Sequence, residues 1–389
     1  MINIYKVIKL IIFPAVLFLI SCNGVYKISI PDQNNDLVDD FKAMTLSAPG
    51  APGVNDKNNC AYNVVEQFEK AFSGDSTYKN DIHNWYFNWN KSLPEADRDP
   101  DYYFNPPYKT GNHKFDPLAY HIQGFVRTND PVFKYAGSHS NIEGREGSVF
   151  FIKQFEGRNY LSSIHETVSQ HPSGVAVLGD YLFVGDGKKI RVYDVANINN
   201  PAKKIEKTYS LPKDHSKYKL NTFGGGIGAV KLENGKILFV VSTPGGTKEY
   251  VRRNKFYLIE GTLLKKVKIK FLNEQEYIGP EKYQYSENMT LISECESGRI
   301  FAVHTGSGHS ISGRGYWRLS LLTKYKKNAL QFETVMVGKT SQNFSGCHLR
   351  SAATAYVNSE GVIEYYCHEY LNNPDFGDWD SFNFKRIHP

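Results

Sequence analysis

Residues 171–195, HPSGVAVLGDYLFVGDGKKIRVYDV, contain three short apolar runs separated by two turn signals. The runs are Gly174–Leu178, Tyr181–Val184 and Ile190–Val195, and the turns are Gly179-Asp180 and Asp186-Gly187. Short turns of this kind close antiparallel hairpins, and 25 residues leave no room for a helix between the runs. The segment therefore predicts an antiparallel meander. A lone meander cannot bury both of its faces, so the chain must supply further sheets.

The pattern recurs at five places along the chain. Each unit opens at a polar or glycine anchor, and the anchors are His121, His171, Gly225, Glu287 and His348, spaced by 50, 54, 62 and 61 residues. The second apolar run of each unit ends near His139, Asp186, Ser242, His304 and His368, respectively. Such units, with three or four strands each, predict an all-β fold, namely a five-bladed β-propeller, with six or seven blades as the alternative count. A sandwich of five unrelated hairpins is the competing interpretation.

The N-terminus carries the features of an export signal. Lys6 and Lys9 precede Leu10–Ile20, an apolar run of 11 residues that is too short to span a bilayer comfortably. The segment Leu19-Ile20-Ser21-Cys22 resembles the lipobox of bacterial lipoproteins. That resemblance implies cleavage before Cys22, acylation of its thiol with chains such as palmitate, and stable attachment to a membrane. Asn23, in place of aspartate, favours the outer membrane if the envelope is Gram-negative.

One unit also resembles a named repeat. Residues 174–204 read GVAVLGDYLFVGDGKKIRVYDVANINNPAKK. This looks like the LVIVD repeat of bacterial surface propellers, which consists of an apolar hairpin, an ADG-like turn and an LRVVDVSNP-like strand and exit. Gly187 and Arg191–Asn197 fill the corresponding places, with Gly185 where alanine is usual. The resemblance implies a propeller fold but no particular activity, since a fold does not fix function.

The chain divides into four segments by composition. Residues 1–21 are expected to be a lipoprotein signal peptide, 22–56 a tether, 57–117 a helical and aromatic-rich extension, and 118–389 the propeller. An apolar stripe predicts a helix over Cys60–Phe72. Residues 83–117 are rich in aromatic side chains, which fits either a loop packed on the propeller flank or a lid over its mouth. The last unit is one strand short, and Val25–Ile30 is the predicted closing strand.

Charge and cysteine content narrow the classes of partner. Without the signal peptide, 44 basic and 40 acidic residues remain, and no dense Lys/Arg block is present, so we expect no nucleic-acid binding. The basic segment Leu264–Lys270 alternates with apolar residues, as an outer strand with one solvated face would. An oxidising compartment allows disulfides among Cys60, Cys295, Cys347 and Cys367, although a Cys347–Cys367 pair fits the hairpin poorly. Buried free thiols are the alternative.

The anchors and the ends of the second runs should meet at one face of the ring, because the strands that they belong to are antiparallel. The candidate ligand-binding residues of this face are His121, Gln123, His139, His171, Asp186, Glu287, His304, His348, Arg350 and His368. Imidazoles and a carboxylate that converge in this way can bind a ligand, hold a divalent metal or form a structural polar ring. The candidate metal ligands are His121, His171, Glu287 and His348.

These candidates predict a lipid-anchored envelope protein that binds a glycan, a peptide or a protein partner through its axial face. A metal-dependent hydrolase with its site in the same funnel is the alternative. The sequence does not identify a cofactor, but the His and Glu candidates are suitable ligands for a divalent metal.

Overall fold

The computed structural model describes residues 26–27, 60–72, 82–87, 122–139, 147–155, 158–166, 172, 174–186, 189–212, 225–243, 253–276, 288–295, 297–307, 315–325, 329–339, 353–369 and 382–387. Strands dominate these residues, and the elements named below are the β-strands, the one α-helix and the one 3₁₀ turn found among them.

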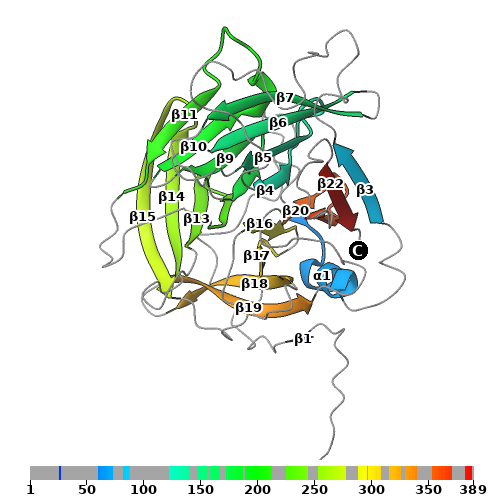
Figure 1. Ribbon diagram of the computed structural model, residues 1–389. Helices are drawn as coiled ribbons and strands as arrows, with labels where there is room; N and C mark the ends of the chain where they lie inside the picture. The colour runs from blue at the N-terminus through cyan, green and yellow to red at the C-terminus, as the bar shows by residue number, and fades with distance from the viewer. Residues whose placement is uncertain are drawn as a thin grey trace, which may run out of the picture.

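The described strands form five sheets with a core of four strands each (Figure 1). The first sheet contains β4 (Ile122–Arg127), β5 (Tyr135–His139), β6 (Ser148–Phe155) and β7 (Arg158–Glu166). The second contains β8 (Val175–Leu178), β9 (Tyr181–Asp186), β10 (Lys189–Asp194) and β11 (Glu206–Ser210), with a 3₁₀ turn at Val195–Asn197. The third contains β12 (Ile227–Lys231), β13 (Ile237–Thr243), β14 (Arg253–Thr262) and β15 (Lys266–Glu276). The fourth contains β16 (Asn288–Glu294), β17 (Ile300–Ser307), β18 (Gly315–Tyr325) and β19 (Ala329–Lys339). The fifth contains β20 (Ala353–Val357), β21 (Ile363–Glu369), β22 (Phe382–Ile387) and β3 (Ile82–Phe87).

The first strands of the five sheets form a ring. β4 contacts β8, β8 contacts β12, β12 contacts β16, β16 contacts β20, and β20 contacts β4. In each sheet the later strands lie progressively farther from this ring. Antiparallel meanders arranged around a common axis define a propeller-type fold. The all-β, propeller-type prediction is therefore confirmed, and the meander predicted at residues 171–195 is present as β8, β9 and β10.

The cores lie between neighbouring sheets. Phe183 of β9 and Phe239 of β13 are fully buried, and their ring centroids lie 5.7 Å apart across the interface of the second and third sheets. Val267 and Ile269 of β15 pack against the same cluster. Each fully buried side chain of this size stabilises the fold by roughly 1.5–3 kcal/mol relative to exposure. Because alternate side chains of a strand point to opposite faces, one set of apolar side chains in each strand packs against the neighbouring sheet.

The predicted closing strand was wrong. A strand from the N-terminal region does complete the last sheet, but it is β3, which pairs antiparallel with β22 and places Trp85 opposite Phe384. From the predicted segment, Tyr26–Lys27 forms β1 and instead pairs with β19 of the fourth sheet. Residues 83–87 of the predicted aromatic loop are thus part of a strand, and the rest of that loop lies outside the described residues. Both segments suit an edge strand by composition, so only the chain path distinguishes them.

Helix α1 (Val64–Phe72) fills the space between the fourth and fifth sheets (Figure 1). Phe68 and Phe72 are buried, and the Phe72 ring lies 5.5 Å from Trp317 of β18 and 5.0 Å from Tyr365 of β21. The predicted apolar stripe is therefore present, but the helix begins at Val64 and not at Cys60. Residues Cys60–Ala61 form β2, which pairs in parallel with the end of β16.

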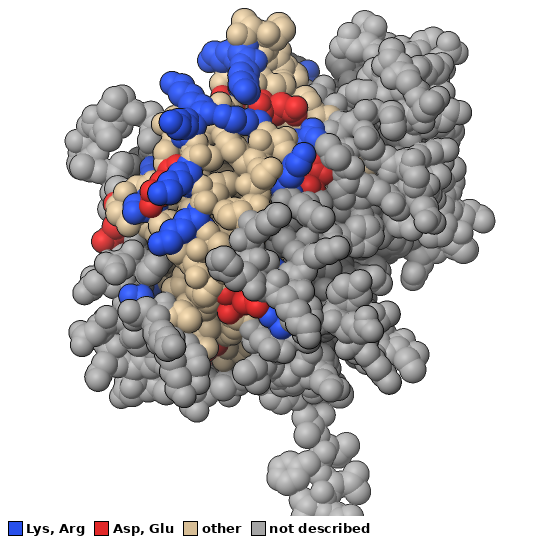
Figure 2. All heavy atoms as spheres, turned by 90° about the vertical axis from the view of Figure 1, so that its left-hand side faces the viewer, with Lys and Arg blue, Asp and Glu red and all other residues tan. Residues whose placement is uncertain are grey.

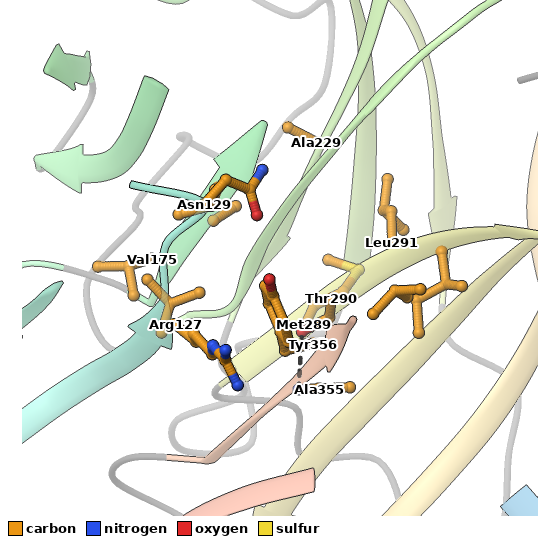
Figure 3. Close-up of a pocket in the computed structure, with 14 residues that line it drawn as sticks. Arg127, Asn129, Val175, Ala229, Met289, Thr290, Leu291, Ala355 and Tyr356 are labelled. Atoms are coloured by element: carbon orange, nitrogen blue, oxygen red, sulfur yellow. Dashed lines mark hydrogen bonds between the residues drawn. The ribbon is translucent and has the colours of Figure 1, made fainter. Parts of the chain in front are cut away.

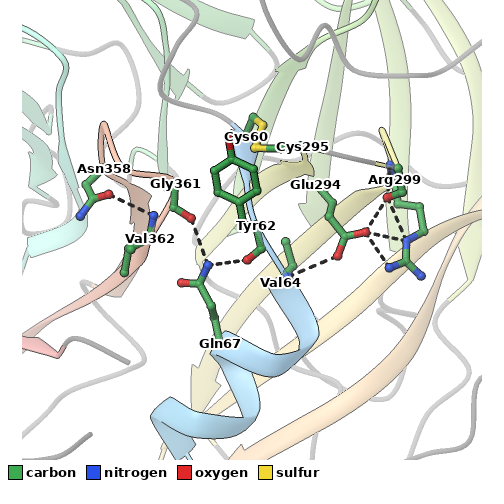
Figure 4. The surroundings of a disulfide bond; sticks show 11 residues. Cys60, Tyr62, Val64, Gln67, Glu294, Cys295, Arg299, Asn358, Gly361 and Val362 are labelled. Atoms are coloured by element: carbon green, nitrogen blue, oxygen red, sulfur yellow. Dashed lines mark hydrogen bonds and ion pairs between the residues drawn. A yellow bond between two sulfur atoms is a disulfide. The ribbon is translucent and has the colours of Figure 1, made fainter.

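A disulfide joins this segment to the ring. Cys60 is bonded to Cys295, which follows β16, with 5.0 Å between their Cα atoms (Figure 4). Next to it, the Val64 amide donates a hydrogen bond of 3.3 Å to the buried Glu294 carboxylate, which also accepts from Arg299 at 2.6 and 2.9 Å. A carboxylate at a helix N-terminus satisfies an otherwise unpaired amide. The start of α1 is therefore set by the fourth sheet. Among the described residues, no helix is long and apolar enough to cross a membrane.

Candidate functional site

A small cavity lies on the axis, and every strand of the inner ring contributes to its wall (Figure 3). One residue from each strand illustrates this: Val126, Ala176, Ala229, Thr290 and Ala355. The cavity volume is about 20 Å³. That is room for about one water molecule, well short of the space that a small-molecule ligand needs.

Hydrogen bonds between neighbouring inner strands hold them close together and leave little space at the axis of the ring. Thr290 Oγ1 of β16 lies 3.1 Å from Thr354 Oγ1 of β20 and accepts a hydrogen bond of 3.2 Å from the Ala355 amide. The small side chains that follow the anchors serve close packing. A Cβ atom added at Gly124 would lie 3.0 Å from the Val175 amide nitrogen, and one added at Gly228 would lie 2.7 Å from Leu291 Cγ. Glycine at these positions therefore allows the inner strands to lie close together.

A polar cluster borders the cavity where β4 and β20 end. Arg127 Nη1 donates hydrogen bonds of 2.9 Å to Glu364 Oε2 and of 2.9 Å to the Tyr366 hydroxyl. The Tyr366 hydroxyl in turn donates to the same Glu364 oxygen, and the Arg127 guanidinium lies 4.5 Å from the centre of the Tyr356 ring. The cluster joins the first sheet to the last.

The electrostatics of this cluster favour a charged arginine and a protonated tyrosine. Burial alone would lower the pKa of Arg127, but Tyr366, Tyr356 and Glu364 outweigh it, and the net pKa is raised. Burial raises the pKa of Tyr366, with Arg127 opposing. The guanidinium and the Glu364 carboxylate thus compensate one another, and Tyr366 stays a hydrogen-bond donor at neutral pH. This pattern fits a structural ion pair with little capacity left for a ligand.

The predicted axial face lies at the opposite ends of the inner strands. Three of its candidate residues are described in full: Gln123 at the start of β4, Asp186 at the end of β9, and His304 near the end of β17. All three side chains are buried. Asp186 forms an ion pair of 3.0 Å with Arg191 of β10. In this structure all three side chains therefore belong to the interior of the fold.

His304 and Arg318 are cross-strand neighbours at this end of the fourth sheet, and both are fully buried. Burial lowers the pKa of His304 to about 3 and that of Arg318 to about 9. The Phe332 ring lies edge-on to His304 at 5.4 Å. His304 is consequently neutral at pH 7, whereas Arg318 retains its charge.

The other candidates can be placed only in part. His139 lies on β5 opposite Ile122, and His368 lies on β21 opposite Phe384, so both are at the expected ends of the second strands. The remaining candidates lie outside the described residues: His121, His171, Glu287, His348 and Arg350. All four predicted metal ligands are in that group. Among the described residues, no three His, Cys, Asp or Glu side chains form a metal-binding group.

Sequence reasoning missed the Arg127–Glu364–Tyr366 cluster. One signal was available, because Glu364 interrupts an otherwise apolar and aromatic strand, VIEYYC. A charged residue in such a strand needs a partner. The partner, however, lies 237 residues away in sequence, which no local pattern can reveal.

Comparison with known proteins gives little further guidance. No protein-family model matches the chain, and no curated protein matches it in sequence. Among solved structures, the chain is similar to a candidate 6-phosphogluconolactonase from Bacteroides uniformis, with 11% identity, a TM-score of 0.31, and coverage of 68% of this chain and 85% of that one. A second candidate 6-phosphogluconolactonase, from Bacteroides fragilis, shows 9% identity, a TM-score of 0.32, and coverage of 64% and 80%. These TM-scores are too low to bear on fold or activity, so the propeller-type assignment rests on the sheets themselves.

Proposed function

We propose that this chain is a lipid-anchored binding protein of the bacterial cell envelope, built on a five-bladed propeller. Support for five blades comes from the number of sheets and from the closed order of their first strands. The Arg127–Glu364 pair, which joins the first sheet to the fifth, supports the same count.

The exported location rests on two features. The lipobox-like segment ending at Cys22 supplies the anchor, and attachment through several acyl chains is stable. The Cys60–Cys295 disulfide fits an oxidising compartment, because cytosolic proteins seldom keep structural disulfides. Because Asn23, and not an aspartate, follows Cys22, we propose the outer membrane as the location.

The small size of the axial cavity is the observation that favours a protein that binds a ligand on its surface over an enzyme that encloses a small-molecule substrate. Its volume of about 20 Å³ admits about one water molecule, so within the described part of the ring a larger ligand would contact the surface and not this cavity. A glycan, a peptide or a protein segment suits a surface of that kind. The residues proposed for contact are those that open the inner strands, with His121, His171 and His348 foremost.

A metal-dependent hydrolase is the second candidate. His121, His171, Glu287 and His348 all precede inner strands and are therefore expected at one end of the ring, and neutral imidazole and carboxylate are suitable ligands for zinc, iron or manganese. A bound divalent ion there would activate water or polarise a carbonyl group.

The anchor is tested by feeding cells an alkynyl palmitate and comparing the wild type with Cys22→Ala. We expect label in the membrane fraction of the wild type and none in the variant. A variant that stays labelled, or a wild type that is unlabelled, contradicts the anchor.

The axial face is tested with a variant that carries His121→Ala, His171→Ala and His348→Ala. Both proteins are applied to arrays of glycans and peptides and are analysed for metals by mass spectrometry. Ligands bound by the wild type and lost in the variant, without a stoichiometric metal, support the binding protein. Stoichiometric metal lost in the variant favours the hydrolase, and identical array profiles contradict the proposed binding face.

A further inference from the structure

A row of lysines runs along the outer strand of the third sheet. Lys266, Lys268 and Lys270 alternate on β15, and all three are exposed. Alternate residues of a strand share a face and lie roughly 7 Å apart. The opposite face of the same strand packs Val267 and Ile269 against the core. The lysines are therefore held in line by a strand that is fixed on its other side.

The row continues into the neighbouring sheet. Lys265 is exposed in the turn before β15, and Lys207 of β11 donates a hydrogen bond to its carbonyl oxygen. The Lys207 ammonium lies 5.2 Å from the centre of the Tyr209 ring. Figure 2, which faces this side of the molecule, shows more Lys and Arg than Asp and Glu over the described surface, with acidic side chains beside several of the basic ones.

The carboxylate of Glu260 does not neutralise the row. Glu260 of β14 lies opposite Lys268 in the sheet, but its ion pair of 2.8 Å is with Lys236. The hydrogen bond and charge of Lys236, with Lys268 and Lys270 contributing, lower the pKa of Glu260. Glu260 thus stands beside several ammonium groups, and its one negative charge leaves an excess of positive charge in the row at neutral pH.

We infer that this row, Lys207, Lys265, Lys266, Lys268 and Lys270, is a docking surface for a linear polyanionic glycan, such as a polyuronate. The linear arrangement of the lysines is the reason for proposing this ligand. The cations form a line along one strand, which matches the regularly spaced carboxylates of an extended polymer better than it matches the two-dimensional array of a membrane. The inference rests on the proposed exported location but does not depend on the axial face.

Protection of a sheet edge is the competing explanation, since lysines on edge strands prevent edge-to-edge pairing. Edge protection predicts aggregation when the lysines are removed but no change in glycan binding. Lys207 adds to the charge from another sheet, which edge protection of β15 does not require.

The test is binding of the soluble protein, without its signal peptide, to polygalacturonate by calorimetry at low salt. Methyl-esterified polygalacturonate has the same backbone without the charge, and vesicles of phosphatidylglycerol test the membrane instead. We expect binding to polygalacturonate alone, with an affinity that falls as salt rises.

Substitutions of lysines inside and outside the row test whether this surface binds the glycan. Lys268→Gln with Lys270→Gln should weaken binding about tenfold, in line with exposed charge pairs. Lys153→Gln with Lys189→Gln removes two exposed lysines from other sheets and should leave binding unchanged. Equal losses in both variants, equal binding to the methyl ester, or binding to vesicles in place of the glycan would each overturn the inference. The His121, His171 and His348 variant should still bind polygalacturonate, which separates this surface from the axial face.

Discussion

Arg127 on β4 and Glu364 on β21 form an ion pair of 2.9 Å that joins the first and the fifth sheet. The Glu364 side chain is 5% exposed and that of Arg127 is 22% exposed, so the pair is largely withdrawn from water. The pair therefore adds a side-chain contact between the two sheets that meet where the ring closes, next to the closure that β3 makes in the fifth sheet.

Arg127→Met should destabilise the protein by about 2–3 kcal/mol, because it leaves the Glu364 carboxylate buried without its cation. Urea unfolding measures the change. Arg127→Met combined with Glu364→Leu should recover part of the loss, since the pair is then replaced by apolar side chains. A double variant that is less stable than Arg127→Met alone would contradict this account.

The Cys60–Cys295 disulfide bridges a sequence separation of 235 residues and holds α1 against the fourth sheet. Changing both cysteines to serine should cost about 2–4 kcal/mol, because the unfolded chain gains freedom. Guanidinium unfolding with and without a reductant checks this. The reductant should destabilise the wild type and leave the double-serine variant unchanged; a wild type that is insensitive to the reductant would show that the bridge does not matter.

Phe72 on α1 fills the space between Trp317 and Tyr365. Phe72→Ala should cost about 3–5 kcal/mol because a cavity remains between the sheets. Gly338→Ala should also destabilise, since its new Cβ would lie 2.7 Å from Phe72 Cγ. Thermal unfolding monitored by tryptophan fluorescence checks both. Lys70→Ala, on the exposed side of α1, serves as the control and should change stability by less than about 0.5 kcal/mol.

The buried imidazole of His304 should make stability depend on pH. Its pKa is lowered by burial from 6.5 to about 3. Since the unfolded state takes up the proton more readily, this contribution is complete above pH 6.5 and is lost as the pH falls from 6.5 towards 3.

Within that window the slope approaches about 1.4 kcal/mol per pH unit for one group. Urea midpoints at pH 7 and pH 5 should fall less in His304→Gln than in the wild type. Arg318 and Phe332, which face His304, do not titrate in this range. Identical pH profiles for the two proteins would contradict the assignment.

Much of the secondary structure followed from the sequence alone. The glycine-containing turn at Gly179-Asp180 and the apolar runs beside it predicted β8 and β9, because strand alternation and turn chemistry are local properties. The recurrence of that pattern predicted an all-β, propeller-type fold. The stripe through Val64, Phe68 and Phe72 likewise predicted a helix with one buried face.

The candidate site was less accessible from the sequence. Spacing brought Gln123, Asp186 and His304 to one end of the sheets, but it could not show that their side chains point into the interior. Alternation assigns residues to two faces and does not say which face is covered, since that depends on the neighbouring sheet.

The sequence by itself therefore determined the strands, the turns, the repeat and the alternating lysines of residues 264–270, all of which depend on neighbours within a few residues. Tertiary structure alone decided which edge β3 joins, which cysteines meet, and which partner Glu364 finds. Those choices depend on segments that are hundreds of residues apart and equally suitable by composition. Closure of the ring brings one of the competing segments within bonding distance of its partner and keeps the other segments apart from it.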